Sequence, residues 1–79
     1  MKIAVRLFAS AREAVGASEI ELHISPGSTV MDLKEAACRL YPALRRSPAR
    51  WAVNLEFVDG RRELKAGDEV AFIPPVSGG

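Results

Sequence analysis

The chain has 79 residues, of which 48% are hydrophobic and 27% are charged, and its formal net charge is +1. This length allows one small domain with a core of about a dozen side chains and excludes a multidomain protein. The near-neutral charge argues against partners such as nucleic acid or a membrane surface, and a single cysteine and a single histidine leave no basis for a disulfide or a metal cage. Without a transmembrane run or a signal peptide, we expect a cytoplasmic protein.

Two segments near the N-terminus, 2–9 and 19–25, alternate apolar and polar residues as half-buried strands do. Their predicted inward-facing residues are Ile3, Val5, Leu7, Ile20, Leu22 and Ile24. Between the two segments, Ser10 and Glu13 fit a capping box and Gly16 supplies a stop. This pattern predicts a short helix between two strands.

The longest predicted helix begins after Thr29, an N-cap residue with Asp32 three positions further on, and ends before Pro42. Its apolar stripe consists of Val30, Leu33, Ala37, Leu40 and Tyr41. Residues 42–50 are basic and lack periodicity, which predicts a surface loop.

Three strand candidates follow, at residues 51–54, 56–58 and 69–73. The order of elements predicts an α+β fold, with one main helix across one face of a mixed sheet of four to five strands. We expect the last strand to lie beside the first, which brings Phe8 close to Ile73 in an apolar surface patch.

The sequence ends with two prolines and four uncharged residues. The prolines end strand pairing and stiffen the exit, which favours a projecting tail over an ordinary solvated terminus. Gly78 and Gly79 have no Cβ, so they can enter a narrow passage and leave the terminal carboxylate open to attack once it is activated. We therefore predict a domain over residues 1–75 and a projecting tail over residues 76–79.

Three stretches carry a resemblance to a known family. Residues 65–79 (KAGDEVAFIPPVSGG), 8–13 (FASARE) and 52–54 (AVN) closely resemble the small, sulfur-carrier subunits of molybdopterin synthase, also called molybdopterin converting factor subunit 1. The resemblance implies the ubiquitin-like β-grasp fold, which agrees with the predicted order of elements. Residues 42–50 depart from the family pattern.

The resemblance also implies a carrier cycle. An ATP-dependent, E1-like adenylating enzyme activates the terminal carboxylate, and a sulfur-donor system converts it to a thiocarboxylate. The large subunit of molybdopterin synthase then passes the sulfur to cyclic pyranopterin monophosphate (precursor Z). Gly79 would carry the sulfur and Gly78 would give access. The chain would bind no cofactor, would not be an enzyme alone, and would rely on the catalytic pocket of the large subunit.

Partner-binding residues follow from the same resemblance. Phe8, Phe57 and Ile73 fall where the family has an apolar surface that binds both the large subunit and the activating enzyme. Together with the tail, the expected partner-binding residues are Phe8, Phe57, Ile73, Pro74, Pro75, Val76 and Ser77.

Other residues invite functional hypotheses that the pattern disfavours. Cys38 lies at the edge of the helical stripe, where a cysteine acts as a small hydrophobe rather than a sulfur carrier. His23 alternates with outward-facing glutamates and is expected to be solvated. The basic loop together with Trp51 could suggest RNA contact, but the neutral total favours a solvated loop.

Three functions stay open from the sequence. The first is the molybdopterin synthase carrier, which the run from Phe72 to Ser77 favours. The second is a carrier of the same fold that serves thiamine synthesis or another thiolation. The third is a ubiquitin-like modifier that is joined through Gly79 to lysines of target proteins.

Overall fold

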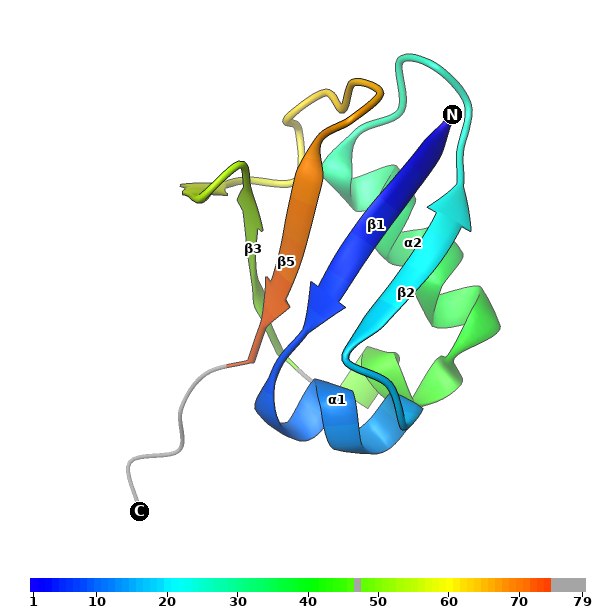
Figure 1. Cartoon of the computed structure of the whole chain (residues 1–79), viewed down its shortest axis with the longest axis vertical. Coiled ribbons are helices and arrows are strands. Elements are labelled where there is room, and N and C mark those ends of the chain that lie inside the picture. Colours follow the sequence, from blue (N-terminus) through cyan, green and yellow to red (C-terminus); the bar gives the residue numbers. More distant parts are fainter. Residues whose placement is uncertain (47, 75–79) are drawn as a thin grey trace.

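Five strands form one sheet in the order β2-β1-β5-β3-β4 in the computed structural model, which describes residues 1–46 and 48–74 (Figure 1). The strands are β1 (Lys2–Leu7), β2 (Glu19–His23), β3 (Arg50–Val53), β4 (Glu56–Val58) and β5 (Glu69–Ile73). The helices are α1 (Ala9–Val15), α2 (Val30–Leu40) and the 3₁₀ helix η1 (Pro42–Arg46). This arrangement confirms the predicted α+β class.

The two central strands of the sheet are the first and the last in sequence. β1 and β5 pair in parallel, whereas the β1–β2, β3–β4 and β3–β5 pairs are antiparallel. The sheet is therefore mixed, and the predicted pairing of the last strand with the first is confirmed. None of the helices within the described residues is long and apolar enough to cross a membrane.

Helix α2 lies across one face of the sheet, behind it in Figure 1, and begins at the predicted cap. The Thr29 hydroxyl accepts a hydrogen bond from the Asp32 N–H at 3.3 Å, and the Asp32 carboxylate accepts one from the Thr29 N–H at 2.9 Å. The two bonds satisfy amides that the first helical turn leaves free.

The core lies between α2 and the sheet. Its largest fully buried side chains are Phe72, Ile3, Leu7, Leu33, Leu44, Leu64, Val5, Val30, Val53 and Val70. On α2 the prediction for Leu40 was wrong, because its side chain is 63% exposed. The helix ends at this residue, and η1 brings Leu44 into the core instead.

The first helix does not begin as predicted. Strand β1 ends at Leu7 rather than Ala9, and α1 starts at Ala9 with Phe8 as its N-cap residue and no side-chain cap, so the Ser10 capping box is wrong. This earlier start buries Ala11 completely against the core. The predicted stop at Gly16 is confirmed, because this residue has a φ of 82° and donates its N–H to the Arg12 carbonyl at 2.8 Å.

Both ends of the segment predicted as a surface loop, residues 42–46 and Arg50, belong to regular elements. Residues Pro42–Arg46 form η1, and Arg50 already belongs to β3. Trp51 is buried and packs edge-to-face on Phe72, with ring centroids 4.9 Å apart, so its ring is not available for stacking on RNA bases. Strand β2 also ends earlier than predicted, at His23.

Candidate functional site

The strand register builds a shallow hollow on the face of the sheet opposite α2. On this open face Ala71 of β5 pairs with Ala52 of β3 on one side and with Arg6 of β1 on the other. Ala52 in turn pairs with Phe57 of β4. Because side chains in one cross-strand row share a face, two methyl groups lie between a guanidinium and an aromatic ring. The small alanines leave a depression between the two large neighbours.

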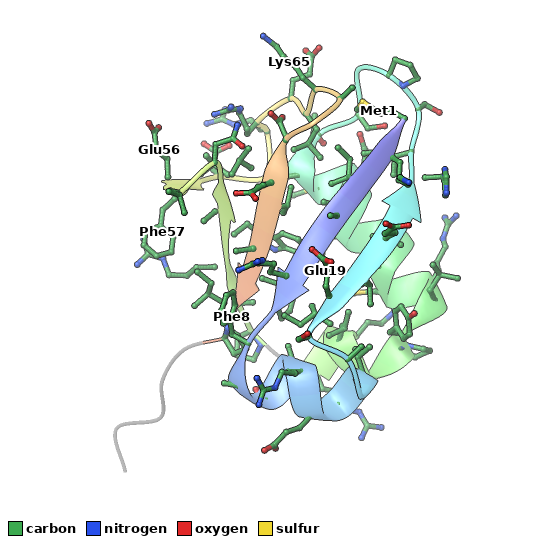
Figure 2. The ribbon with its side chains drawn as sticks, in the orientation of Figure 1. Met1, Phe8, Glu19, Glu56, Phe57 and Lys65 are labelled. Atoms are coloured by element: carbon green, nitrogen blue, oxygen red, sulfur yellow. The ribbon has the colours of Figure 1, made fainter. Side chains whose placement is uncertain are left out.

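This depression, which we call the groove, has a volume of ≈ 250 Å³. It is lined by Arg6, Phe8, Ala52, Leu55, Phe57, Glu69, Val70, Ala71 and Ile73. Three of its apolar side chains face solvent, since Phe8 is 43%, Phe57 56% and Leu55 94% exposed. Figure 2 shows Phe57 at the β4 edge and Phe8 where β1 ends. The predicted proximity of Phe8 and Ile73 is confirmed, because both line the groove. Their role in partner binding stays a prediction.

One rim of the groove is the two-residue turn that joins β3 to β4. Asn54 and Leu55 both have left-handed backbone angles, with φ of 51° and 71°. The Asn54 side chain accepts a hydrogen bond from the Glu69 N–H and donates one to the Asp68 carboxylate, both at 3.0 Å. The Asn54 N–H also donates to the Glu69 carbonyl at 2.8 Å. These bonds fix the turn to the start of β5.

The Asp68 carboxylate connects the β3–β4 turn to the segment before β5. It accepts hydrogen bonds from the Lys65 N–H at 2.8 Å and from the Asn54 amide. The Lys65 hydrogen bond is the main reason that the pKa of Asp68 is lowered; the Asn54 amide and the charges of Arg62 and Lys65 also lower it, while partial burial opposes the shift. Asp68 is therefore charged at neutral pH and holds the turn.

Arginines border the groove. The Arg50 guanidinium stacks 4.0 Å from the centroid of the Phe57 ring. Arg6 lines the groove and also a neighbouring hollow of ≈ 250 Å³ that contains Arg12. Within residues 1–46 and 48–74 none of these three arginines forms an ion pair with a carboxylate. The surface thus combines an apolar floor with cations that can pair with acidic groups of another molecule.

The predicted site residues divide into two sets. Phe8, Phe57 and Ile73 come together in the groove, and Pro74 is buried at the end of β5. Pro75, Val76, Ser77, Gly78 and Gly79 lie outside the described residues, so the division at residue 75 and the roles of the tail stay predictions.

Sequence reasoning missed the alanine floor and Leu55. Period-two alternation does place Ala52 and Ala71 opposite their buried neighbours, but only the pairing of β3 with β5 puts them side by side. Cys38 is buried in the core and His23 is exposed, as expected. In the part of the chain that the structure describes, no three His, Cys, Asp or Glu side chains gather as metal ligands.

Five strands in this order, with α2 across one face and an apolar groove on the other, define a ubiquitin-like β-grasp domain. The crystal structure of SAMP1, small archaeal modifier protein 1, from Haloferax volcanii has a TM-score of 0.91 with 29% identity, and the match covers 100% of both chains. Residues 5–79 match the ThiS family, and the chain belongs to this family.

Two relatives carry the same name. The chain is 39% identical over 83 residues to the molybdopterin synthase sulfur carrier subunit of Chlamydomonas reinhardtii, and the match covers 100% of both proteins. It is 36% identical to the subunit of the same name from Arabidopsis thaliana, with 100% of this chain and 84% of the relative covered.

Proposed function

We propose that this chain is the sulfur-carrier small subunit of a molybdopterin synthase and acts in molybdenum cofactor biosynthesis. The observation that carries the proposal is the 39% identity, over the full length of both proteins, with a relative of that name. The groove supports it, because a carrier must dock on other proteins and this face offers an apolar floor with a charged border.

The reactive group of the proposed carrier is the Gly79 carboxylate. A carboxylate is a poor electrophile, so an E1-like enzyme first joins it to the AMP part of ATP and releases pyrophosphate. A sulfur nucleophile from the donor system then displaces AMP and leaves a thiocarboxylate. Gly78 and Gly79 suit this chemistry because the absence of Cβ atoms lets the end of the chain enter a narrow active site.

The groove and the tail belong to one docking event in this proposal. Five residues follow Pro74, and an extended chain of that length reaches about 17 Å. An enzyme that acts on Gly79 must therefore sit close to the end of β5. Phe8 and Ile73 line the groove at that end, so the enzyme that receives the tail is well placed to cover them.

The proposal assigns substrate binding and acid–base chemistry to the large subunit, in a heterotetramer of the two subunits. There the thiocarboxylate gives its sulfur to cyclic pyranopterin monophosphate. The small subunit contributes the sulfur and the docking surface. This division agrees with the described residues, whose groove is apolar with one carboxylate, that of Glu69.

A second candidate is a ubiquitin-like modifier that is linked through Gly79 to lysines of other proteins. The likeness to SAMP1, which has modifier in its name, favours this candidate. Both functions need the same activated C-terminus, and they differ in the acceptor.

The test of the proposal is a reconstituted sulfur transfer. After incubation with the activating enzyme, ATP and a sulfur source, the intact mass should rise by the difference between sulfur and oxygen, with the change mapped to Gly79. The purified thiocarboxylated chain should then convert the pterin precursor in a single turnover with the large subunit. Modification at Cys38 would contradict the proposal. Lysine-linked conjugates in cell lysate, without pterin conversion, would support the modifier instead.

A further inference from the structure

Backbone strain in the described part of the chain lies at the groove or directly beside residues that line it. Among the described residues, three that are not glycine have a positive φ: Ala9 (48°), Asn54 (51°) and Leu55 (71°). Ala9 directly follows Phe8, and Leu55 itself lines the groove. Residues with a Cβ avoid this conformation, and strain that persists in a folded protein is often found at functional sites.

Leu55 is the most unusual of the three. Two-residue hairpin turns with left-handed angles at both positions prefer asparagine followed by glycine, and here leucine takes the glycine position. Its side chain is 94% exposed, so almost no burial in this chain offsets the strain. We therefore expect the free protein to be at least as stable with glycine at this position.

Hydrogen bonds of the preceding residue hold the backbone of the turn that carries Leu55. Asn54 is fastened to Asp68 and Glu69 by three hydrogen bonds of 2.8–3.0 Å. A side chain on a fixed turn loses less conformational entropy on binding than one on a flexible loop. Leu55 is therefore pre-organised for contact with another molecule.

We propose that Leu55 is a specificity-determining docking residue, whose side chain enters an apolar pocket on the large subunit of molybdopterin synthase. This inference rests on the proposed function. The large subunit is the occupant because it must receive the tail beyond the end of β5. The groove runs from Ile73 at that end of the strand to Leu55 beside its start, so a partner that covers the whole groove contacts Leu55. The charge of the groove border indicates what surrounds the pocket, because among the described residues Arg6 and Arg50 form no ion pair with a carboxylate. We expect carboxylates to border the pocket on the large subunit.

Affinity and stability should respond to Leu55 in opposite ways. Leu55→Gly removes both the side chain and the strain, and Leu55→Asn removes the apolar contact but keeps a residue that tolerates the left-handed conformation. We expect both variants to bind the large subunit roughly tenfold more weakly. Their melting temperatures should equal or exceed that of the unchanged protein. Leu40→Ala is the matched control, because Leu40 is also exposed but lies on α2, away from the open face.

Titration calorimetry with the purified large subunit measures the affinity of each variant, and thermal unfolding measures its melting temperature. Binding of both variants within about twofold of the unchanged chain would overturn the docking role. A clear fall in the melting temperature of both would also overturn it, because Leu55 would then support the fold. If the unchanged chain itself neither binds the large subunit nor transfers sulfur to the precursor, the proposed function fails, and the inference fails with it.

Discussion

Ala52 and Ala71 show how single side chains shape the groove. Each contributes only a methyl group, and together they form the floor between Arg6 and Phe57. A depression on an open sheet face exists only where the central residues are small. The groove is therefore as much a consequence of these two alanines as of the aromatic residues beside them.

Replacing Ala71 tests this directly. Ala71→Leu should fill the groove and weaken binding of the large subunit by roughly tenfold or more, because the partner loses the cavity that it packs against. The fold should be retained, since Ala71 is only partly buried and faces solvent. Titration calorimetry measures the affinity, and circular dichroism reports the fold.

Ala4→Leu is the control for that experiment. Ala4 lies on the same open face and is also partly buried, but it does not line the groove. Its replacement should leave the affinity unchanged. Equal losses from the two substitutions would mean that bulk anywhere on the face disturbs binding and that the groove has no special role.

At the scale of the elements, the strands and α2 follow from local sequence signals. Period-two patterns predict β1 and β2, and short runs of strand-forming residues predict β3, β4 and β5, all to within two residues. Thr29 with Asp32 marks the start of α2. These signals depend on neighbours in the sequence. They can therefore be recognised without knowledge of the rest of the fold.

Other elements depend on contacts that the sequence does not display. The start of α1 is set by the burial of Ala11, and η1 forms because Leu44 reaches the core between the other helices. The groove needs the register of four strands, β1, β5, β3 and β4, and neither β1 nor β3 is close to β5 in sequence. The expected pairing of the last strand with the first placed Phe8 near Ile73. The β3–β5 register and the turn after β3, which bring Ala52 and Leu55 to the site, could not be predicted from the sequence.

The link between the hairpin turn and β5 should depend on pH. The pKa of Asp68 is lowered in the folded protein, mainly by the Lys65 N–H, so its charge stabilises the fold above its unfolded pKa of about 3.9. This contribution is lost as the pH falls through the lower pKa of the folded state. We expect Asp68→Asn to reduce the free energy of unfolding by about 0.5–1.5 kcal/mol at pH 7.

Urea denaturation of both proteins between neutral pH and about pH 2.5 measures this difference. The difference in the free energy of unfolding between the unchanged protein and Asp68→Asn should be constant above about pH 5 and should decrease below about pH 4. Other titrating groups affect both proteins equally and cancel in the comparison. If this difference in free energy stays the same down to the lowest pH, the charged carboxylate has no role in stability.

At the scale of the whole molecule, docking and chemistry should be separable. One alanine added after Gly79 leaves the sheet and the groove unchanged, so the variant should fold and still bind the large subunit. It should lose sulfur transfer, because the carboxylate moves by about 3.5 Å and a misplacement of that size can cost on the order of 100-fold in rate. Single-turnover conversion of the pterin precursor measures the loss.

Cys38→Ser is the companion variant, with an intact tail and a changed buried thiol. Its transfer rate should stay near that of the unchanged chain. Normal transfer by the extended chain, or loss of transfer in the serine variant, would mean that Gly79 is not the sulfur donor.

The parallel pairing of β1 with β5 has a consequence for how the protein folds. The middle of the sheet joins the first strand to the last, so its central contacts are non-local and should make folding slower than in a helical domain of this size. During synthesis, β1 has no central partner until β5 has left the ribosome. Ala71 and Ile73 lie on that same strand, next to the tail. A nascent chain therefore has no complete groove before its C-terminal strand has emerged from the ribosome.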